Sequence, residues 1–299
     1  MRGALEARVK CRYINRYINS RTMPYCVNCR RELVGNENPP SICHECRTAI
    51  ARSQLQNAAP AHRSLMVAGS PVTAGIIGVN ALVYVAMVVS GVSPFAPNLA
   101  DLLRWGADSG VQTLTTQPWR ILTSNYVHIG LLHIVLNMWC LWNLGALAER
   151  IFDRWTYFFT YTVCGVAGSI VSLWWHPMGV GAGASGAIFG MAGALISALY
   201  LGHLPVHPQA MKSTLKSLLS FAGYNLFFGT VVPGIDNSAH IGGLISGLIL
   251  GAVLARHLTS PPRERNSWRN WVFIVAGLIL LLAFRLVRHA ALRGAIANG

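Results

Sequence analysis

Long apolar runs recur along the chain from Pro71 onward, and they restrict its fold more than any other feature. A helix needs roughly 17–25 apolar residues to cross a bilayer. Six runs are about that long, at 72–89, 129–148, 155–175, 185–201, 217–232 and 239–255. With 53% hydrophobic and only 11% charged residues, the chain is too apolar for an ordinary soluble domain. We therefore expect an all-α polytopic membrane protein built around a six-helix bundle.

A seventh apolar run, 270–284, is shorter and lies between Arg269 and Arg285. It can cross the membrane only if those arginines extend their side chains to the two interfaces. We expect an additional C-terminal transmembrane helix here, and the alternative is a helix that lies on the membrane surface. Arg285, Arg288 and Arg293 would then face outward, which runs against the usual charge distribution.

The formal net charge of +14 is concentrated outside the apolar runs. Before Pro71 there are eleven Lys and Arg residues but only four Asp and Glu residues. Positive residues favour the cytoplasmic side, so we expect a multi-pass protein of a plasma or inner membrane with its N-terminus in the cytoplasm. Basic chains can also bind nucleic acid. The basic residues here fit a membrane topology better than a nucleic-acid-binding face, so we expect no nucleic-acid partner.

Four cysteines near the N-terminus have the spacing of a zinc ribbon. Cys26 and Cys29 form one C-x2-C pair, and Cys43 and Cys46 form a second pair after thirteen intervening residues. Four thiolates complete a tetrahedral shell that favours structural zinc and leaves no open position for catalysis. Two disulfides or a redox pair are the alternatives, disfavoured by the cytosolic location and by the doubled motif. We expect a small zinc-binding domain, with docking of a cytoplasmic partner as its suggested role.

These features divide the chain into five segments. The segments are a basic arm (1–22), a zinc-ribbon-like domain (23–48), a polar linker (49–70), the six-helix core (71–256) and an additional helix with its tail (257–299). Between the first two spans, the loop of 91–128 is unusually long and contains scattered Leu and Trp residues, which favours short amphipathic helices on the bilayer surface. Trp119 and Arg120 in this loop are suited to the headgroup level.

Polar side chains occur near the start of three apolar runs. Ser185 begins the fourth run after Gly183-Ala, where small residues leave the hydroxyl accessible. His133 and Asn137 share one helix face near the start of the second run, and His240 lies near the start of the sixth. Helices two, four and six all begin on the outer side, so these residues share one membrane depth. Each could be a helix-packing residue, but three unrelated packing residues have no reason to share a depth.

This set of side chains fits peptide hydrolysis. A serine hydroxyl needs an adjacent base, and a neutral histidine is suited to that task. We therefore expect Ser185 to be the nucleophile and His240 the general base. His133, Asn137 and the backbone N–H of Ser185 are placed to stabilise the oxyanion, and no cofactor is needed for catalysis. Asp236 could orient His240, although capping of the helix is the simpler role.

Several motifs occur in a fixed order across residues 72–255. They are Trp119-Arg120, His128, His133-x-x-x-Asn137, Gly145-x-x-x-Glu149, Gly183-Ala-Ser185-Gly186 and Ala239-His240-Ile-Gly-Gly243-x-x-x-Gly247. This combination resembles the rhomboid family of intramembrane serine proteases. The resemblance implies a six-helix core, the dyad of Ser185 and His240, His133 and Asn137 in the oxyanion hole, and Phe189 against the catalytic histidine. It also implies that the substrates are transmembrane proteins cleaved in or beside their membrane segments.

Two other functional classes are alternatives to a protease. A rhomboid-like pseudoprotease would bind and escort membrane helices without cleaving them, but the intact Ser185, His240, His133 and Asn137 argue against it. A small channel or transporter is the other class, and the sequence shows neither an inverted repeat nor paired interrupted helices. Glu149 lies at the cytoplasmic end of its span and is expected to tie helix ends together.

Overall fold

The computed structural model describes residues 69–297 together with Cys26, Cys29, Cys46 and Thr48. The chain divides into two compact units, Met1–Leu65 and Met66–Gly299. The basic arm of 1–22, and all of the linker of 49–70 except its last two residues, lie outside the described residues. The structural account of the membrane domain therefore concerns the second unit.

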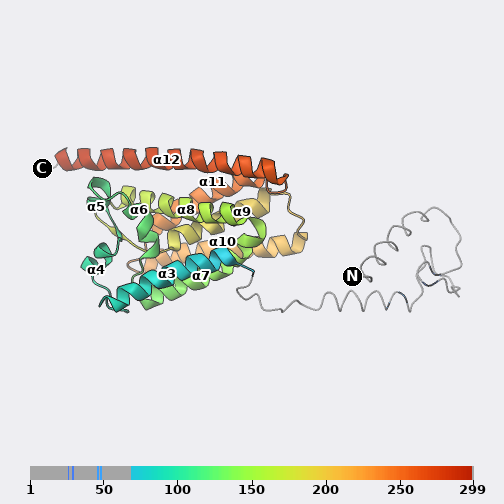
Figure 1. The fold of residues 1–299 in the computed structure, drawn as a ribbon, viewed down its shortest axis with the longest axis horizontal. Coiled ribbons are helices and arrows are strands. Elements are labelled where there is room, and N and C mark those ends of the chain that lie inside the picture. The colour runs from blue at the N-terminus through green and yellow to red at the C-terminus, as the bar shows by residue number, and fades with distance from the viewer. Residues whose placement is uncertain (1–25, 27–28, 30–45, 47, 49–68, 298–299) are drawn as a thin grey trace. The chain divides into compact units, whose positions relative to one another are not determined.

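The second unit is a bundle of helices that follow the predicted apolar runs (Figure 1). Its long helices are α3 (Pro71–Val89), α7 (Leu131–Ile151), α8 (Arg154–Trp175), α9 (Ser185–Leu201), α10 (Pro208–Val231), α11 (Asn237–Ala255) and α12 (Pro262–Ala297). Within residues 69–297, five of these helices are long and apolar enough to cross a membrane, namely α3, α7, α8, α11 and α12. The expected all-α polytopic fold is confirmed.

The loop between α3 and α7 is largely folded, as expected from its length and apolar residues. It contains α4 (Leu99–Arg104), β1 (Asp108–Ser109), α5 (Gly110–Thr115), α6 (Arg120–Thr123) and the 3-10 turn η1 (Ser124–Tyr126). Strand β1 pairs antiparallel with β2 (Val180–Gly181), and Asp108 lies opposite Gly181. This short pairing joins the loop to the segment that leads into α9.

Two helices extend beyond the predicted apolar runs. Helix α10 begins at Pro208 instead of 217, because Pro208 suits the first helical turn and the His207 ring accepts a hydrogen bond from the Gln209 N–H (3.3 Å). Helix α12 has 36 residues instead of the predicted fifteen at 270–284. The predicted boundaries were wrong because charged residues end an apolar run without ending a helix. At 1.5 Å per residue, α12 is about 54 Å long and exceeds a hydrocarbon core of about 30 Å.

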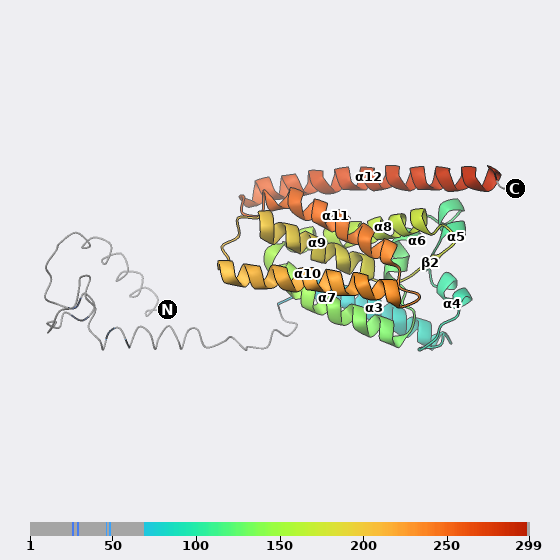
Figure 2. The same ribbon diagram turned by 180° about the vertical axis from the view of Figure 1, so that it is seen from behind.

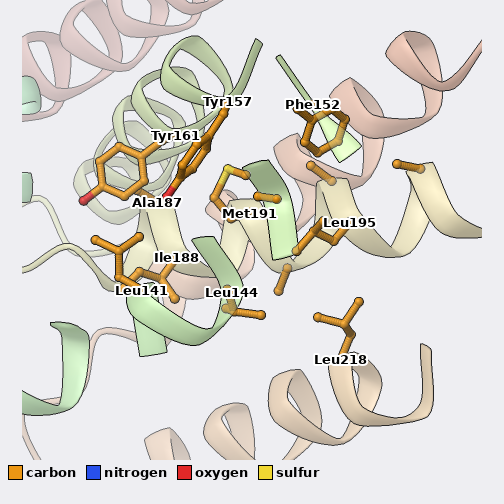
Figure 3. Close-up of a cluster of buried hydrophobic side chains, with 14 of the residues drawn as sticks. Leu141, Leu144, Phe152, Tyr157, Tyr161, Ala187, Ile188, Met191, Leu195 and Leu218 are labelled. Carbon is orange, nitrogen blue, oxygen red and sulfur yellow. The ribbon is translucent and has the colours of Figure 1, made fainter. Parts of the chain in front are cut away.

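Helix α9 lies at the centre of the bundle, between α10 and α11 in Figure 2. Thirteen of its 17 residues are buried. Its side chains pack against α7, α8 and α10 in the cluster of Figure 3, which includes Leu141, Leu144, Tyr157, Tyr161, Ala187, Ile188, Met191, Leu195 and Leu218. A helix surrounded on all sides can be apolar around its whole circumference, which explains why this run shows no polar face.

Helices α9 and α11 approach each other at backbone distance, as the Gly243-x-x-x-Gly247 motif predicts. A Cβ atom built at Gly247 would lie 2.6 Å from the carbonyl carbon of Gly190 and 2.8 Å from its Cα. A Cβ at Gly243 would likewise overlap the backbone of Gly186. Glycine at these positions therefore sets the separation between the two helices.

Contacts at both ends attach α12 to the bundle. At one end, Arg269 forms an ion pair with Asp153 (3.1 Å). Toward the other end, Phe284 is buried in a cluster with Leu114 of α5, and Arg288 donates a hydrogen bond to the Thr115 carbonyl (3.0 Å). Figure 1 shows α12 running beside α8 and α11 toward α5. The seventh helix is thus packed against the bundle along much of its length.

Glu149 ties α7 to the first turn of α3, as expected. Its carboxylate accepts hydrogen bonds from the Thr73 N–H (2.8 Å), the Thr73 hydroxyl (2.7 Å) and the Val72 N–H (3.3 Å). The unpaired N–H groups at a helix N-terminus favour a carboxylate at this place. The role of Glu149 is therefore structural, at the end of the bundle away from Ser185.

Candidate active site

Ser185 is the first residue of α9, and the turn before it is shaped by Gly183. Gly183 has a φ of +125°, a conformation that side-chain-bearing residues rarely adopt. Its N–H donates to the Ser124 carbonyl (2.9 Å), which holds the turn against η1. A Cβ at Gly183 would lie 2.6 Å from Cε1 of His133. The His133 ring therefore lies directly against the turn that presents Ser185.

His240 lies on the face of α9 that carries Ser185. Its ring stacks on Phe189, with centroids 4.3 Å apart and an interplanar angle of 13°. Phe189 is four residues after Ser185, so the two side chains lie one above the other on the helix. Nδ1 of His240 is buried without a hydrogen-bond partner among residues 69–297, and no hydrogen bond in that range joins the ring to Ser185 Oγ. The structure thus brings the two helices together without forming the hydrogen bond of a dyad.

His133 and Asn137 are held mainly by backbone groups near the start of α7. Nδ1 of His133 accepts a hydrogen bond from the Ile129 N–H (3.2 Å), which leaves Nε2 on the side of Gly183. The side-chain amide of Asn137 donates to the His133 carbonyl of its own helix (2.9 Å). The ring of His128 is fully buried, with its centroid 5.2 Å from that of His133. His133 is therefore next to the turn that presents Ser185, whereas the amide of Asn137 is turned toward its own backbone.

Asp236 caps α11 and does not orient His240. Its carboxylate accepts hydrogen bonds from the Ala239 N–H (3.0 Å) and from the hydroxyls of Ser172 and Ser238. Since Nδ1 of His240 has no partner in residues 69–297, Asp236 is not a third member of a catalytic group in this structure. The simpler expectation of a helix cap is confirmed.

A small polar cavity lies beside Ser185, and the sequence patterns pointed to none of its other polar side chains except Asp236. It is lined by Asp108, Ser124, Asn125, Ser169, Ser172 and Asp236 together with the glycines around Ser185. Asp108 is only 2% exposed and accepts a hydrogen bond from the Thr113 hydroxyl (2.6 Å). Burial raises the pKa of the Asp108 carboxyl to about 6, and the bond from Thr113 acts in the opposite direction.

Arg120, which is expected at the headgroup level, has its side chain buried inside the protein. Its side chain is buried and donates hydrogen bonds to the Ala107 carbonyl (2.7 Å) and to Oε1 of Gln117 (2.6 Å). The neighbouring Trp119 is 49% exposed, with its ring 4.8 Å from the guanidinium. Arg120 therefore fixes the fold of the loop that carries Asp108.

Three of the four cysteines of the predicted metal site lie close together. The sulfur atoms of Cys26, Cys29 and Cys46 are all within 4.8 Å of one another, whereas Cys43 lies outside the described residues. Sulfur atoms around a tetrahedral zinc with Zn–S bonds of 2.3 Å are about 3.8 Å apart. The three described thiols are thus compatible with a metal ion of this type.

Known proteins match this chain over its membrane domain. The rhomboid domain family matches residues 115–257. Rhomboid protease GluP of Bacillus subtilis is 35% identical over 178 residues, which cover 60% of this chain and 34% of that protein. RHOMBOID-like protein 6, mitochondrial, of Arabidopsis thaliana is 36% identical over 60% of this chain and 57% of its own length. Rhomboid protease AarA of Providencia stuartii is 28% identical over 71% of this chain and 81% of its own length.

The match includes every helix from α7 to α11 and therefore the whole candidate site apart from Asp108. The match spans about a third of the length of GluP and just over half that of the mitochondrial relative. The fold, the order of the motifs and these matches agree: residues 115–257 of this chain match the rhomboid domain family.

Proposed function

We propose that this protein is an intramembrane serine endopeptidase that cleaves transmembrane proteins in or beside their membrane segments. The observation that carries the proposal is the stacking of His240 on Phe189, one helical turn from Ser185. This places an imidazole from α11 on the face of α9 that bears the hydroxyl. The names of GluP and AarA as rhomboid proteases support the same activity.

In the proposed reaction, Ser185 Oγ attacks the scissile carbonyl while its proton passes to His240. The oxyanion is stabilised by the backbone N–H of Ser185, by His133 and by Asn137, whose amide must turn away from its own helix. The C–N bond then breaks as His240 returns the proton to the leaving amine. Water hydrolyses the resulting acyl ester and regenerates Ser185. Catalytic hydrogen bonds are often absent before substrate binds, so the lack of a hydrogen bond between Ser185 and His240 is compatible with this role.

The substrate must present an unwound peptide bond to this site. Backbone N–H and C=O groups in a helix are already paired, so a membrane helix resists cleavage until it is locally opened. Glycine, alanine or proline in the substrate segment makes opening easier. The Gly and Ala residues around Ser185 favour small side chains at the cleaved position.

The test is cleavage of a co-expressed single-span reporter by the full-length chain. Ser185→Ala should abolish cleavage and labelling by a fluorophosphonate, while wild type is labelled. Ser197→Ala is the matched control because it removes a hydroxyl from the same helix that bonds the Leu248 carbonyl (2.8 Å). The control should retain labelling and cleavage. Labelling that persists in Ser185→Ala would show that the nucleophile is misassigned, and absence of cleavage by wild type would favour a pseudoprotease.

The N-terminal cysteines support a second part of the proposal. We propose that Cys26, Cys29, Cys43 and Cys46 hold one structural zinc ion in a ribbon that docks a cytoplasmic partner. The closeness of three of these sulfurs supports this arrangement. Zinc with four thiolates would stabilise the small domain and take no part in peptide hydrolysis. The basic N-terminal segment favours a cytoplasmic location, in a protein of a plasma or inner membrane.

A further inference from the structure

The last part of α12 carries a basic face that the proposed activity does not use. This face consists of four exposed side chains, those of Arg285, Arg288, His289 and Arg293. Arg285, His289 and Arg293 follow one another at intervals of four residues, so they lie on one side of the helix, and Arg288 is one turn from Arg285. Like charges one turn apart destabilise a helix, so the basic face is more stable with an anion beside it.

No acidic side chain in the described part of the membrane domain pairs with the basic face. The chain contains no Asp or Glu after Glu264. Among residues 69–297, no ion pair includes any residue of the basic face. Arg288 donates a hydrogen bond to the Thr115 carbonyl (3.0 Å), which is an uncharged acceptor, and its guanidinium has further N–H donors. The anion that neutralises this face must therefore come from outside residues 69–297.

Exposed tryptophans on the neighbouring helix α8 indicate where the membrane interfaces lie. Helix α8 begins beside α12, at the ion pair of Asp153 with Arg269. It carries Trp155 at its start (50% exposed) and Trp175 at its end (63% exposed). These tryptophans are separated by 175 − 155 = 20 residues, or about 30 Å of helix, which is the thickness of a hydrocarbon core. Exposed tryptophans at this spacing are typical of the two membrane interfaces.

The basic face lies level with the second of these interfaces. Phe284 packs with Leu173 near the end of α8, and Figure 1 shows α12 running beside α8 toward α5. At 1.5 Å per residue, Arg285 and Arg293 lie about 24 and 36 Å along α12 from the ion pair at the first interface. This interval includes the headgroup layer at the Ser185 end of the bundle, because α5 and β1 belong to one loop and β1 pairs with β2, just before α9.

We propose that the basic face binds the headgroup phosphate of an anionic phospholipid, such as phosphatidylglycerol, in the leaflet at the Ser185 end of the bundle. Phosphate is the anion that a bilayer offers at this depth, and the planar guanidinium of arginine matches its geometry. The packing of Phe284 and the hydrogen bond of Arg288 fix this part of α12, so its guanidinium groups are in place before a lipid arrives. A bound anionic lipid also explains why three arginines gather where the predicted topology disfavours them. This inference does not depend on protease activity.

The experiment titrates purified full-length protein in detergent with phosphatidylglycerol and measures bound lipid by native mass spectrometry. Arg285→Gln combined with Arg293→Gln should weaken binding about 25-fold, because each arginine near an anionic headgroup contributes roughly fivefold. Arg256→Gln combined with Arg263→Gln is the matched control, since both residues are exposed at the other end of the bundle and the net charge falls equally. The control should keep the wild-type affinity. Equal weakening in both double variants, or unchanged affinity in the first, would overturn the proposal.

Three other ligands test whether the partner is an anionic lipid. Phosphatidylcholine has the same phosphate but no net charge, so it should bind about tenfold more weakly than phosphatidylglycerol, and equal affinities would contradict the proposal. Soluble glycerol phosphate should not displace the lipid at the same concentration. Displacement would show that free phosphate is sufficient and that a lipid is not required. Binding of polyglutamate that is lost in the Arg285→Gln, Arg293→Gln variant, while lipid binding persists, would assign the basic face to a protein partner instead.

Discussion

A methyl group added at Gly247 tests whether the spacing of α9 and α11 sets the geometry of the site. In Gly247→Ala, the new Cβ would lie 2.6 Å from the carbonyl carbon of Gly190 and 2.8 Å from its Cα. Ordinary carbon contacts are about 3.5–4.0 Å, and the Gly190 carbonyl oxygen would lie nearer still, so the helices must separate by at least about 1 Å. Since all three clashing atoms belong to backbone, no side-chain rotation can relieve the overlap.

Two effects determine the expected magnitude. Overpacking a tight interface costs about 1–3 kcal/mol, and the higher helix propensity of alanine returns less than about 1 kcal/mol. We therefore expect a net loss of stability of about 1–2 kcal/mol. Ser185 and His240 lie on the two separated helices, and a misplacement of about 1 Å can reduce a rate by about 100-fold. The loss of activity should thus be larger than the loss of folded protein.

The assay measures reporter cleavage and unfolding of the same purified variant in detergent. Gly277→Ala is the matched control because nothing lies within 4 Å of a Cβ at that position of α12. The control should keep wild-type activity and stability. A Gly247→Ala protein with wild-type activity and stability would refute the idea that backbone contact between these helices positions the dyad.

Two further predictions concern charged and metal-binding groups. Burial raises the pKa of Asp108 from 3.8 to about 6; the nearby Asp236 adds to the rise and Arg120 opposes it. The folded protein therefore holds this proton more tightly than the unfolded chain does, and the free energy of unfolding falls as pH increases through this range. Asp108→Asn should be more stable than wild type by about 3 kcal/mol at pH 8 and equal to it below pH 4. Unfolding in detergent measures the difference, and a difference that does not change with pH would contradict this reasoning. Cys29→Ser should lower bound zinc, measured on purified protein by elemental analysis, whereas Cys140→Ser in α7 should leave it unchanged. Equal zinc in both variants would show that the ion is held elsewhere.

The positions of the membrane helices follow from sequence because bilayer thickness sets the length of an apolar run. Helix ends were less predictable. Arg269 interrupts the apolar pattern, yet α12 continues past it, and its guanidinium is paired with Asp153 from a different part of the chain. Arg288 likewise finds the Thr115 carbonyl. Such partners depend on the tertiary fold, so a local pattern cannot reveal them.

The candidate site was predictable where it lies on helices and unpredictable where it lies in the first outer loop. Residues at helix starts share a depth, which made Ser185, His133 and His240 stand out together. Asp108 follows no periodic pattern, and its place beside Ser185 depends on a pairing of only two residues in each strand. One signal was available: Asp108 is one of only two acidic residues in the loop of 91–128.

The hydrogen bond of the proposed dyad depends on the rotation of the Ser185 hydroxyl. Helices α9 and α11 cannot approach further, because glycine backbones already meet at Gly190 and Gly247. The His240 ring is held by its stack on Phe189. The Ser185 hydroxyl has neither constraint, and rotation about a serine Cα–Cβ bond takes picoseconds to nanoseconds. We therefore expect rotation of this hydroxyl, without helix movement, to bring Ser185 Oγ toward the His240 ring when substrate binds.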